Sequence, residues 1–221
     1  MLNRERPLNI VAISDTHQLH GDLLLPAGDL LIHAGDITFF SHSPAVLKEF
    51  NGWLGAQPQR YKVVIPGNHD SLLLLPEHQR TITNAHLLIN SGIELGGLRI
   101  WGSPVTTHAG VAFGTPDPDE RARLWASIPT DLDVLITHVP PYKVLDSAPG
   151  EPDHAGCPQL RAAVIRKRPT LHVFGHVHAG YGAKPTTHTM FVNAALLGAQ
   201  GDLDKRPITL TMCPRAAIRR S

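Results

Sequence analysis

Short runs of apolar residues recur along the chain, and each is followed directly by a loop that contains Asp, Asn, His or Gly. The runs occupy residues 8–14, 29–35, 61–67, 133–138 and 171–176. Their apolar character is continuous rather than alternating, which is typical of strands buried on both faces of a sheet. Helical patterns lie between them at residues 43–57, 118–128 and 157–168. This alternation of strands and helices predicts a layered α/β protein.

The middle and the end of the chain depart from this alternation. Residues 86–90, 92–97 and 98–104 read as strands joined by tight turns, and we expect them to be antiparallel. Residues 188–195 and 207–213 are expected to form a further strand pair. Because no repeat or linker interrupts the pattern, we predict a single domain, residues 1–221, built on a mixed sheet or a sheet sandwich.

Composition agrees with an ordinary globular protein. The chain has 221 residues, 42% hydrophobic and 18% charged, which is enough to bury a core without disulfides or structural metals. Its formal net charge of +1 favours neither nucleic acid nor an anionic membrane, so we expect no dedicated nucleic-acid surface.

Cysteine usage and the N-terminal sequence predict a cytoplasmic protein. Cys157 and Cys213 are too few for a disulfide framework, which favours a reducing compartment. The first residues lack the pattern of a signal peptide. The apolar run 72–75 ends at Pro76, well short of the roughly 18 residues that a membrane span needs.

Polar side chains follow the ends of the apolar runs, where α/β proteins bind their ligands. Each is weak evidence alone, because Asp15 or Asp36 could serve a turn and a lone His138 is more often a partly buried histidine. Their common placement favours a metal site over these separate explanations. The expected ligands are Asp15, His17, Asp36, Asn68, His138, His176 and His178.

The donor set indicates which metals would bind. Oxygen and imidazole donors without a thiolate suit Mn, Fe, Zn, Ni or Co, and are too rich in nitrogen for Mg or Ca. Seven side chains exceed the needs of one ion, whereas two divalent ions that share a carboxylate would use them all. Asn68, His69 and Asp70 follow one another at a buried strand end, where turn formation alone would not require three functional side chains.

The order of these motifs resembles the calcineurin-like metallophosphoesterase family. The motifs are Asp-x-His at 15–17, Gly-Asp at 35–36, Gly-Asn-His-Asp at 67–70, Thr-His at 137–138 and Gly-His-Val-His at 175–178. The stretches IHAGDIT, WGSP, LITHVPP and HVFGHVHAGYG further resemble the metallophosphoesterase-domain-containing subgroup related to class III cyclic nucleotide phosphodiesterases. The resemblance implies a four-layer α/β/β/α sandwich of two mixed sheets flanked by helices.

The resemblance also implies a role for each site residue. One metal would be held by Asp15, His17, Asp36 and His178. The second would be held by Asp36, Asn68, His138 and His176, so that Asp36 bridges the two. His69 would face the substrate as the acid for the leaving group or as a stabiliser of phosphate charge. Asp70 would either orient His69 or cap a helix. Gln18 departs from the small residue typical of the subgroup, which bears on the shape of the pocket.

The implied function is hydrolysis of phosphate esters by in-line attack of a metal-bridging hydroxide, with manganese among the candidate metals. The favoured substrates are cyclic nucleotides or similar small phosphodiesters. The alternatives are a phosphomonoesterase or nuclease of the same family, and a metal-binding scaffold without turnover. Residues 101–114 are expected to form the rim of the substrate pocket, with His69, His108 and Phe113 as substrate-binding residues, although Phe113 alone would more often belong to the core. The sequence leaves the oligomeric state open.

Overall fold

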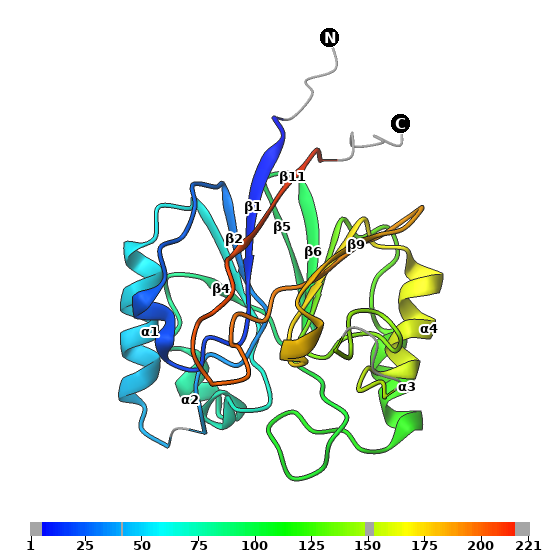
Figure 1. Cartoon of the computed structure of the whole chain (residues 1–221), viewed down its shortest axis with the longest axis horizontal. Coiled ribbons are helices and arrows are strands. Elements are labelled where there is room, and N and C mark those ends of the chain that lie inside the picture. The colour runs from blue at the N-terminus through cyan, green and yellow to red at the C-terminus, as the bar shows by residue number, and fades with distance from the viewer. Residues whose placement is uncertain (1–5, 41, 149–152, 215–221) are drawn as a thin grey trace.

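Figure 1 shows the computed structural model of the chain, which describes residues 6–40, 42–148 and 153–214. One group of strands comprises β1 (Leu8–Ile13), β2 (Leu30–His33), β3 (Tyr61–Val64), β4 (His86–Leu87) and β11 (Ile208–Met212). The other group comprises β5 (Ser91–Leu95), β6 (Leu98–Ser103), β7 (Val134–Thr137), β8 (Leu171–Phe174), β9 (Gly182–Pro185) and β10 (Met190–Asn193). They form two mixed sheets, ordered β11-β1-β2-β3-β4 and β5-β6-β7-β8-β10-β9.

Helices cover the outer face of each sheet (Figure 1). The α-helices are α1 (Ala45–Ala56), α2 (Pro76–Gln79), α3 (Pro118–Ala126) and α4 (Pro158–Lys167). Short 3-10 turns occupy Leu19–Asp22, Ser71–Leu74 and His178–Gly180. Within the described part of the chain, no helix is both long enough and apolar enough to cross a bilayer.

The layers follow from the continuous apolar character of the central strands. Successive side chains of a strand point to opposite faces. In β1, Ile10 therefore packs between the two sheets while Val11 packs under α1. In β7, Ile136 packs between the sheets while Leu135 packs against Leu160 of α4. Both faces of these strands are buried, and the predicted α/β/β/α sandwich is confirmed.

The parallel strands bring their carboxyl ends to one edge of the molecule. β1, β2 and β3 run parallel in the first sheet, and β7 and β8 run parallel in the second. The sheets meet at this edge through a parallel bridge between Ser14 and Ala195. In Figure 1 the edge lies away from the two termini. Loops from both sheets therefore converge there.

Two predicted strand pairings are wrong. Residues 188–195 and 207–213 do not pair with each other, because β10 lies parallel to β8 in the second sheet while β11 lies antiparallel to β1 in the first. β4 lies parallel to β3, whereas the antiparallel hairpin is formed by β5 and β6 alone. β9 was not predicted, since its sequence, Gly182–Pro185, has little apolar character. Strand partners are chosen by contacts far apart in the chain, which a local pattern does not encode.

Candidate metal centre

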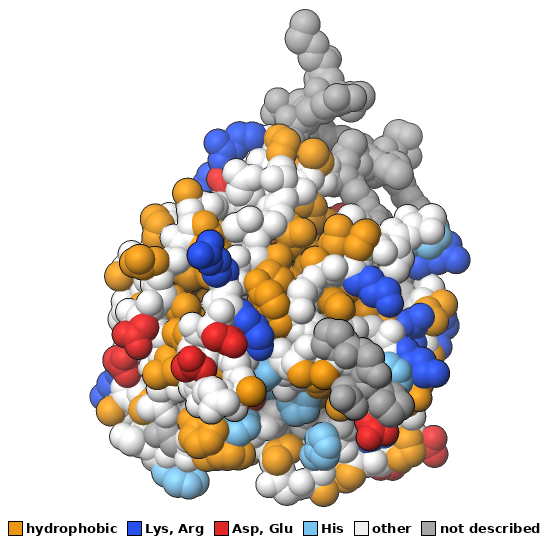
Figure 2. Space-filling model, viewed as in Figure 1, with side chains coloured by type: hydrophobic (Ala, Val, Ile, Leu, Met, Phe, Trp, Pro, Cys, Tyr) orange, Lys and Arg blue, Asp and Glu red, His pale blue; other side chains and the backbone are white. Residues whose placement is uncertain are grey.

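The predicted ligands meet at the carboxyl edge of the two sheets. Figure 2 shows histidine side chains gathered toward that edge of the molecule. Their donor atoms form three groups, each with all of its atoms within 4.8 Å of one another: Asp15, His17 and His178; His17, Asp36 and His69; and Asp36, His138 and His176. Asn68 completes the set, because its Oδ1 lies 2.8 Å from Nε2 of His138. The structure thus brings together all seven residues that the sequence singles out.

Backbone carbonyls orient the two histidines nearest to Asp36. Nδ1 of His138 lies 2.9 Å from the carbonyl oxygen of Ala34, and Nδ1 of His17 lies 3.1 Å from that of Thr38. A proton on each Nδ1 is therefore held by a carbonyl. The Nε2 atoms face Oδ2 of Asp36 at 3.3 Å for His138 and 3.7 Å for His17. This is the arrangement in which imidazoles bind metals, so the donor set fits a divalent transition-metal ion.

The backbone at the ligands is strained. Four of them have φ in the left-handed region, at 55° for Asp15, 42° for His17, 55° for Asp36 and 68° for His176. Non-glycine residues rarely adopt this conformation, which persists where the surrounding structure enforces it and which gathers at functional sites. The strand ends are therefore bent to aim these side chains into the cluster.

Glycines let the loops approach the two aspartates closely. A Cβ on Gly175 would lie 2.0 Å from Oδ2 of Asp15, and a Cβ on Gly67 would lie 2.1 Å from Oδ1 of Asp36. Without these atoms, the N–H of His176 donates to the Asp15 carboxylate at 3.0 Å, and the N–H of His69 donates to Asp36 at 2.9 Å. The glycines are needed for close approach rather than for the turn alone.

The buried charges favour a cation. Burial alone would lower the pKa of His138, but the carboxylate of Asp36 raises that pKa to about 9. Burial would raise the pKa of Asp15, yet the hydrogen bond from His178 and the charges of His138 and His178 bring it below its usual range. Burial lowers the pKa of His176 to about 4. Binding of a metal to His138 would therefore displace a proton that Asp36 otherwise holds there.

Comparison with known proteins identifies the family. The family model described as calcineurin-like phosphoesterase matches residues 8–180. The chain belongs to this family. The family is metal-dependent, and the clustered Asp and His side chains could hold its ions.

Curated relatives of this calcineurin-like phosphoesterase include metallophosphoesterase domain-containing protein 1 of Homo sapiens. The two are 38% identical over 84% of this chain and 65% of that protein, so the chain spans somewhat less than two thirds of the relative's length. A Caenorhabditis elegans protein of the group UPF0046 is 34% identical over 91% of this chain and 74% of its own.

Solved structures share the fold. The protein TT1561 of Thermus thermophilus superposes with a TM-score of 0.62 at 13% identity, covering 95% of this chain and 100% of that one. The phosphopantetheinyl hydrolase of Mycobacterium tuberculosis gives a TM-score of 0.55 at 14% identity, covering 85% and 88%. At these identities the likeness concerns the fold alone.

Asp70 ties two of the site loops together. Its buried carboxylate accepts hydrogen bonds from the N–H groups of Gly67, Ile37 and Thr38 at 2.8, 3.1 and 2.8 Å, and from the hydroxyl of Thr38 at 3.0 Å. It makes no capping hydrogen bond to the 3-10 turn that follows it. Burial and the nearby Asp36 raise the pKa of Asp70 to about 6. The side chain therefore positions the loops after β2 and β3.

Two phenylalanines that sequence reasoning missed lie against His69. The ring centroid of Phe40 is 3.8 Å from that of His69, and Phe39 stacks on the same ring at 5.3 Å. Both rings are open to solvent, with 62% of Phe39 and 48% of Phe40 exposed. The signal in the sequence was a pair of large apolar residues in a polar loop just after Gly-Asp-Ile-Thr.

The loop of residues 101–114 reaches the site at two points. The N–H of Ala112 donates to the carbonyl of Asn68 at 3.2 Å, and the ring of His108 lies 6.0 Å from that of His176. Phe113 packs against the apolar cluster between the first sheet and α1. This packing agrees with the alternative that Phe113 belongs to the core. Contact of His108 and Phe113 with the substrate stays a prediction.

Proposed function

We propose that this chain is a metal-dependent phosphodiesterase that hydrolyses small phosphodiesters, with cyclic nucleotides as the favoured substrates. The observation that carries the proposal is the arrangement around Asp36. Asp36 belongs to two of the three donor groups, and Nε2 of His69 lies 3.8 Å from its Oδ2. Such a site combines cation binding with a proton-transferring side chain at a solvent-accessible edge.

The proposed cofactors are two divalent ions drawn from Mn, Fe, Zn, Ni or Co. The first would be held by Asp15, His17, Asp36 and His178, and the second by Asp36, Asn68, His138 and His176. The division is supported by the separate donor groups and by Asp36, which lies within 3.7 Å of a histidine Nε2 in each. When bound, two such ions would activate a water and neutralise charge on the phosphoryl group.

The proposed role of His69 is to hold or release a proton at Nε2. Its Nδ1 is buried, and among the described residues it has no hydrogen-bond partner, so no neighbour fixes one tautomer. Burial lowers the pKa of His69, and the carboxylate of Asp36 opposes this effect. In this proposal the imidazole exchanges a proton with the leaving oxygen. Asp70 acts through the backbone of Gly67 rather than on the substrate.

The aromatic pair supports a substrate with a planar ring. Phe39 and Phe40 flank His69 and stay exposed, so they offer an apolar wall beside the reacting group. Stacking on such rings contributes about 0.5–1.5 kcal/mol beyond simple burial. A nucleobase next to a phosphodiester fits this wall. The net charge of +1 gives no support to the nuclease alternative.

Activity profiling with defined metals tests the proposal. Metal-free protein is reloaded with Mn, Fe, Zn, Ni or Mg, and turnover of bis-p-nitrophenyl phosphate, p-nitrophenyl phosphate and 3′,5′-cyclic AMP is measured. We expect diester turnover with a transition metal, and a fall in kcat of about 10²–10⁴-fold in His69→Ala with unchanged metal content. His86→Ala, which removes an exposed histidine of β4, is the matched control.

Three results would decide against the proposal. No turnover above blank with any metal would favour the alternative of a metal-binding scaffold without turnover. Faster hydrolysis of the monoester than of both diesters would favour a phosphomonoesterase. Unchanged kcat in His69→Ala would remove this residue from the chemistry.

A further inference from the structure

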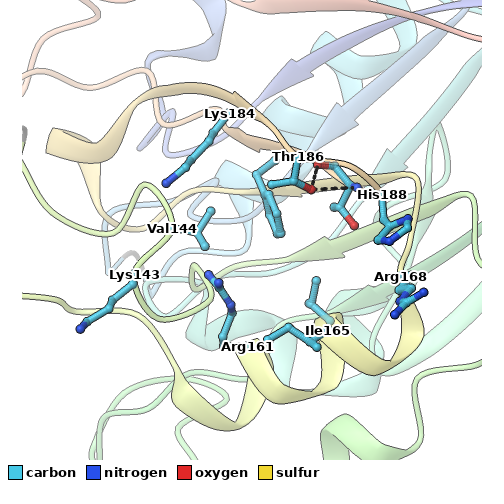
Figure 3. A pocket seen from close by; sticks show the side chains of 11 residues that line it. Lys143, Val144, Arg161, Ile165, Arg168, Lys184, Thr186 and His188 are labelled. Atoms are coloured by element: carbon cyan, nitrogen blue, oxygen red, sulfur yellow. Dashed lines mark hydrogen bonds between the residues drawn. The ribbon is translucent and has the colours of Figure 1, made fainter.

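A second pocket lies apart from the metal centre, between α4 and the β9–β10 hairpin (Figure 3). Its volume is about 270 Å³, and no residue of the metal groups lines it. Val144, Val164 and Phe191 supply a buried apolar wall. Ile165 also lines the pocket and is 57% exposed.

The charged residues of this pocket are all basic. Lys143, Arg161, Arg168 and Lys184 line it together with His188, and no Asp or Glu of the part of the chain that the structure describes does. The whole chain is almost balanced, with 20 Lys and Arg against 19 Asp and Glu. The pocket is therefore a local concentration of positive charge. In Figure 3, Lys143 and Lys184 lie on one side, Arg168 and His188 on the other, and Arg161 extends from α4 between them.

Carboxylates of the described residues do not neutralise these cations. Within residues 6–40, 42–148 and 153–214, none of the four Lys and Arg side chains of the pocket forms an ion pair, whereas Arg6 pairs with Asp29 and Arg99 with Asp133. Arg161 is held instead by a hydrogen bond from Nη1 to the carbonyl of Tyr142 at 3.3 Å. This bond fixes the guanidinium while most of its donors stay available.

The position of Arg161 in its helix raises the positive potential further. α4 begins at Pro158, so Arg161 is in its first turn, where the helix dipole opposes a positive side chain. That turn contains no acidic residue to offset the charge. Helical side chains also point back toward the N-terminus, which directs Arg161 to the positive end. An arginine at this position costs stability, and a bound anion would recover it.

We propose that this pocket binds a small phosphate-bearing organic anion at a site separate from the metal centre. Arginine and lysine groups recognise phosphate oxygens through charge-assisted hydrogen bonds. The apolar wall of Val144, Val164 and Phe191, with Ile165 beside it, would contact a compact apolar body attached to the phosphate. The volume is close to the lower end of typical ligand pockets, about 300 Å³, which favours a ligand of mononucleotide size or smaller.

Methyl NMR of the metal-loaded protein tests the site directly. The isoleucine and valine methyl groups are labelled, and AMP, inorganic pyrophosphate and uncharged adenosine are titrated separately. We expect AMP to shift the methyl signals of Ile165 and Val164 in a saturable way. The double variant Arg161→Gln/Lys184→Gln should weaken this binding at least tenfold.

A matched control removes two exposed basic residues outside the pocket, Lys48→Gln/Arg60→Gln, and should leave the binding unchanged. Diesterase turnover should be the same in both double variants, which separates this site from the metal centre. A shift with pyrophosphate as well as AMP supports the anion site. Absence of shifts at Ile165 and Val164, equal affinity in the two double variants, or equal binding of adenosine would overturn the proposal.

Discussion

His176 and His178 are separated by one residue, yet their donor atoms belong to different groups. The His178 ring lies with Asp15, with 3.3 Å between Nε2 and Oδ1, whereas His176 lies with Asp36 and His138. The left-handed φ of 68° at His176 turns the chain between them. These separate donor groups support the proposal that the two histidines bind different ions.

Single substitutions should separate the two proposed metal positions. We expect His178→Ala to weaken chiefly the ion shared with Asp15 and His17, and His176→Ala chiefly the ion shared with Asn68 and His138. Each loss of metal affinity should exceed the 10–100-fold loss that is typical of residues that only support a metal ligand. Elemental analysis and metal titration of each variant measure this, with Val177→Ala as control. Equal loss of both ions in both variants would contradict the division.

His172 is a buried histidine outside the metal groups, and its imidazole is neutral. The hydroxyl of Thr137 donates to the carbonyl of Val139 at 2.7 Å, so it accepts a hydrogen bond from Nε2 of His172 at 2.9 Å. Nδ1 has no partner among the described residues, and the ring packs near Phe174 and Phe191. Burial lowers the pKa of His172 to about 3.

This residue should make the protein less stable in acid. The unfolded chain binds a proton on His172 near pH 6.5, as a free histidine does, but the folded protein does so only near pH 3. The contribution of the neutral His172 to the free energy of unfolding is therefore complete above pH 6.5 and is lost as the pH falls toward 3. We expect His172→Leu to reduce the drop in unfolding free energy between pH 7 and pH 5 by about 2 kcal/mol. Urea unfolding of metal-free protein at both pH values measures this, and an unchanged drop would show that His172 does not contribute.

At the scale of elements, the carboxylate of Asp70 holds the loops after β2 and β3 at a fixed separation. Asp70 accepts backbone hydrogen bonds from both loops, and these loops carry Asp36 and Asn68. The strand ends alone would not fix their separation, because each loop leaves its own strand. The geometry of the site therefore depends on a carboxylate that is buried against the backbone of both loops.

Removing one acceptor oxygen should loosen both loops together. We expect Asp70→Asn to lower the free energy of unfolding by about 1–3 kcal/mol, because a buried N–H loses its partner. Metal affinity should fall by roughly 10–100-fold, as for other supporting residues. Denaturant unfolding and metal titration measure the two effects, with the exposed Asp131→Asn as control. Normal metal affinity in a destabilised variant would confine Asp70 to a structural role.

At the scale of the whole molecule, the last strand closes the edge of the first sheet next to β1. β11 pairs with β1 in an antiparallel register that places Met212 opposite Leu8 and Leu210 opposite Ile10. Met212 and Leu8 also belong to the core between the sheets. Without β11, the buried strand β1 would become an exposed apolar edge, which favours aggregation.

Two truncations test this closure. We expect a chain that ends after Arg206 to unfold at a lower temperature and to aggregate, since it lacks β11. A chain that ends after Pro214 keeps β11 and should behave like the full chain. Thermal unfolding and light scattering compare them. Equal melting temperatures and monodispersity for both would contradict a stabilising role for this strand.

The local sequence pattern alone predicted three of the helices and the buried strands. The helices at 43–57, 118–128 and 157–168 are confirmed as α1, α3 and α4, and the continuous apolar runs are confirmed as buried strands. The reason is that periodicity, capping residues and breakers act between near neighbours in the chain. Strand partners were predicted less well, since the pairing of β10 with β8 depends on residues that no local pattern connects.

The sequence by itself determined which side chains gather at the candidate metal centre, because each follows an apolar run whose carboxyl end lies at the same edge. The family resemblance implied how they divide between two ions, and the tertiary structure decided the contacts around them. It set His176 and His178 in different donor groups, turned Asp70 toward the backbone and brought Phe39 and Phe40 against His69. It also assembled the basic pocket from residues between Lys143 and Phe191. Strand ends fix which loops meet, but the direction of each side chain depends on left-handed turns and on contacts across two sheets, which arise only when the chain is folded.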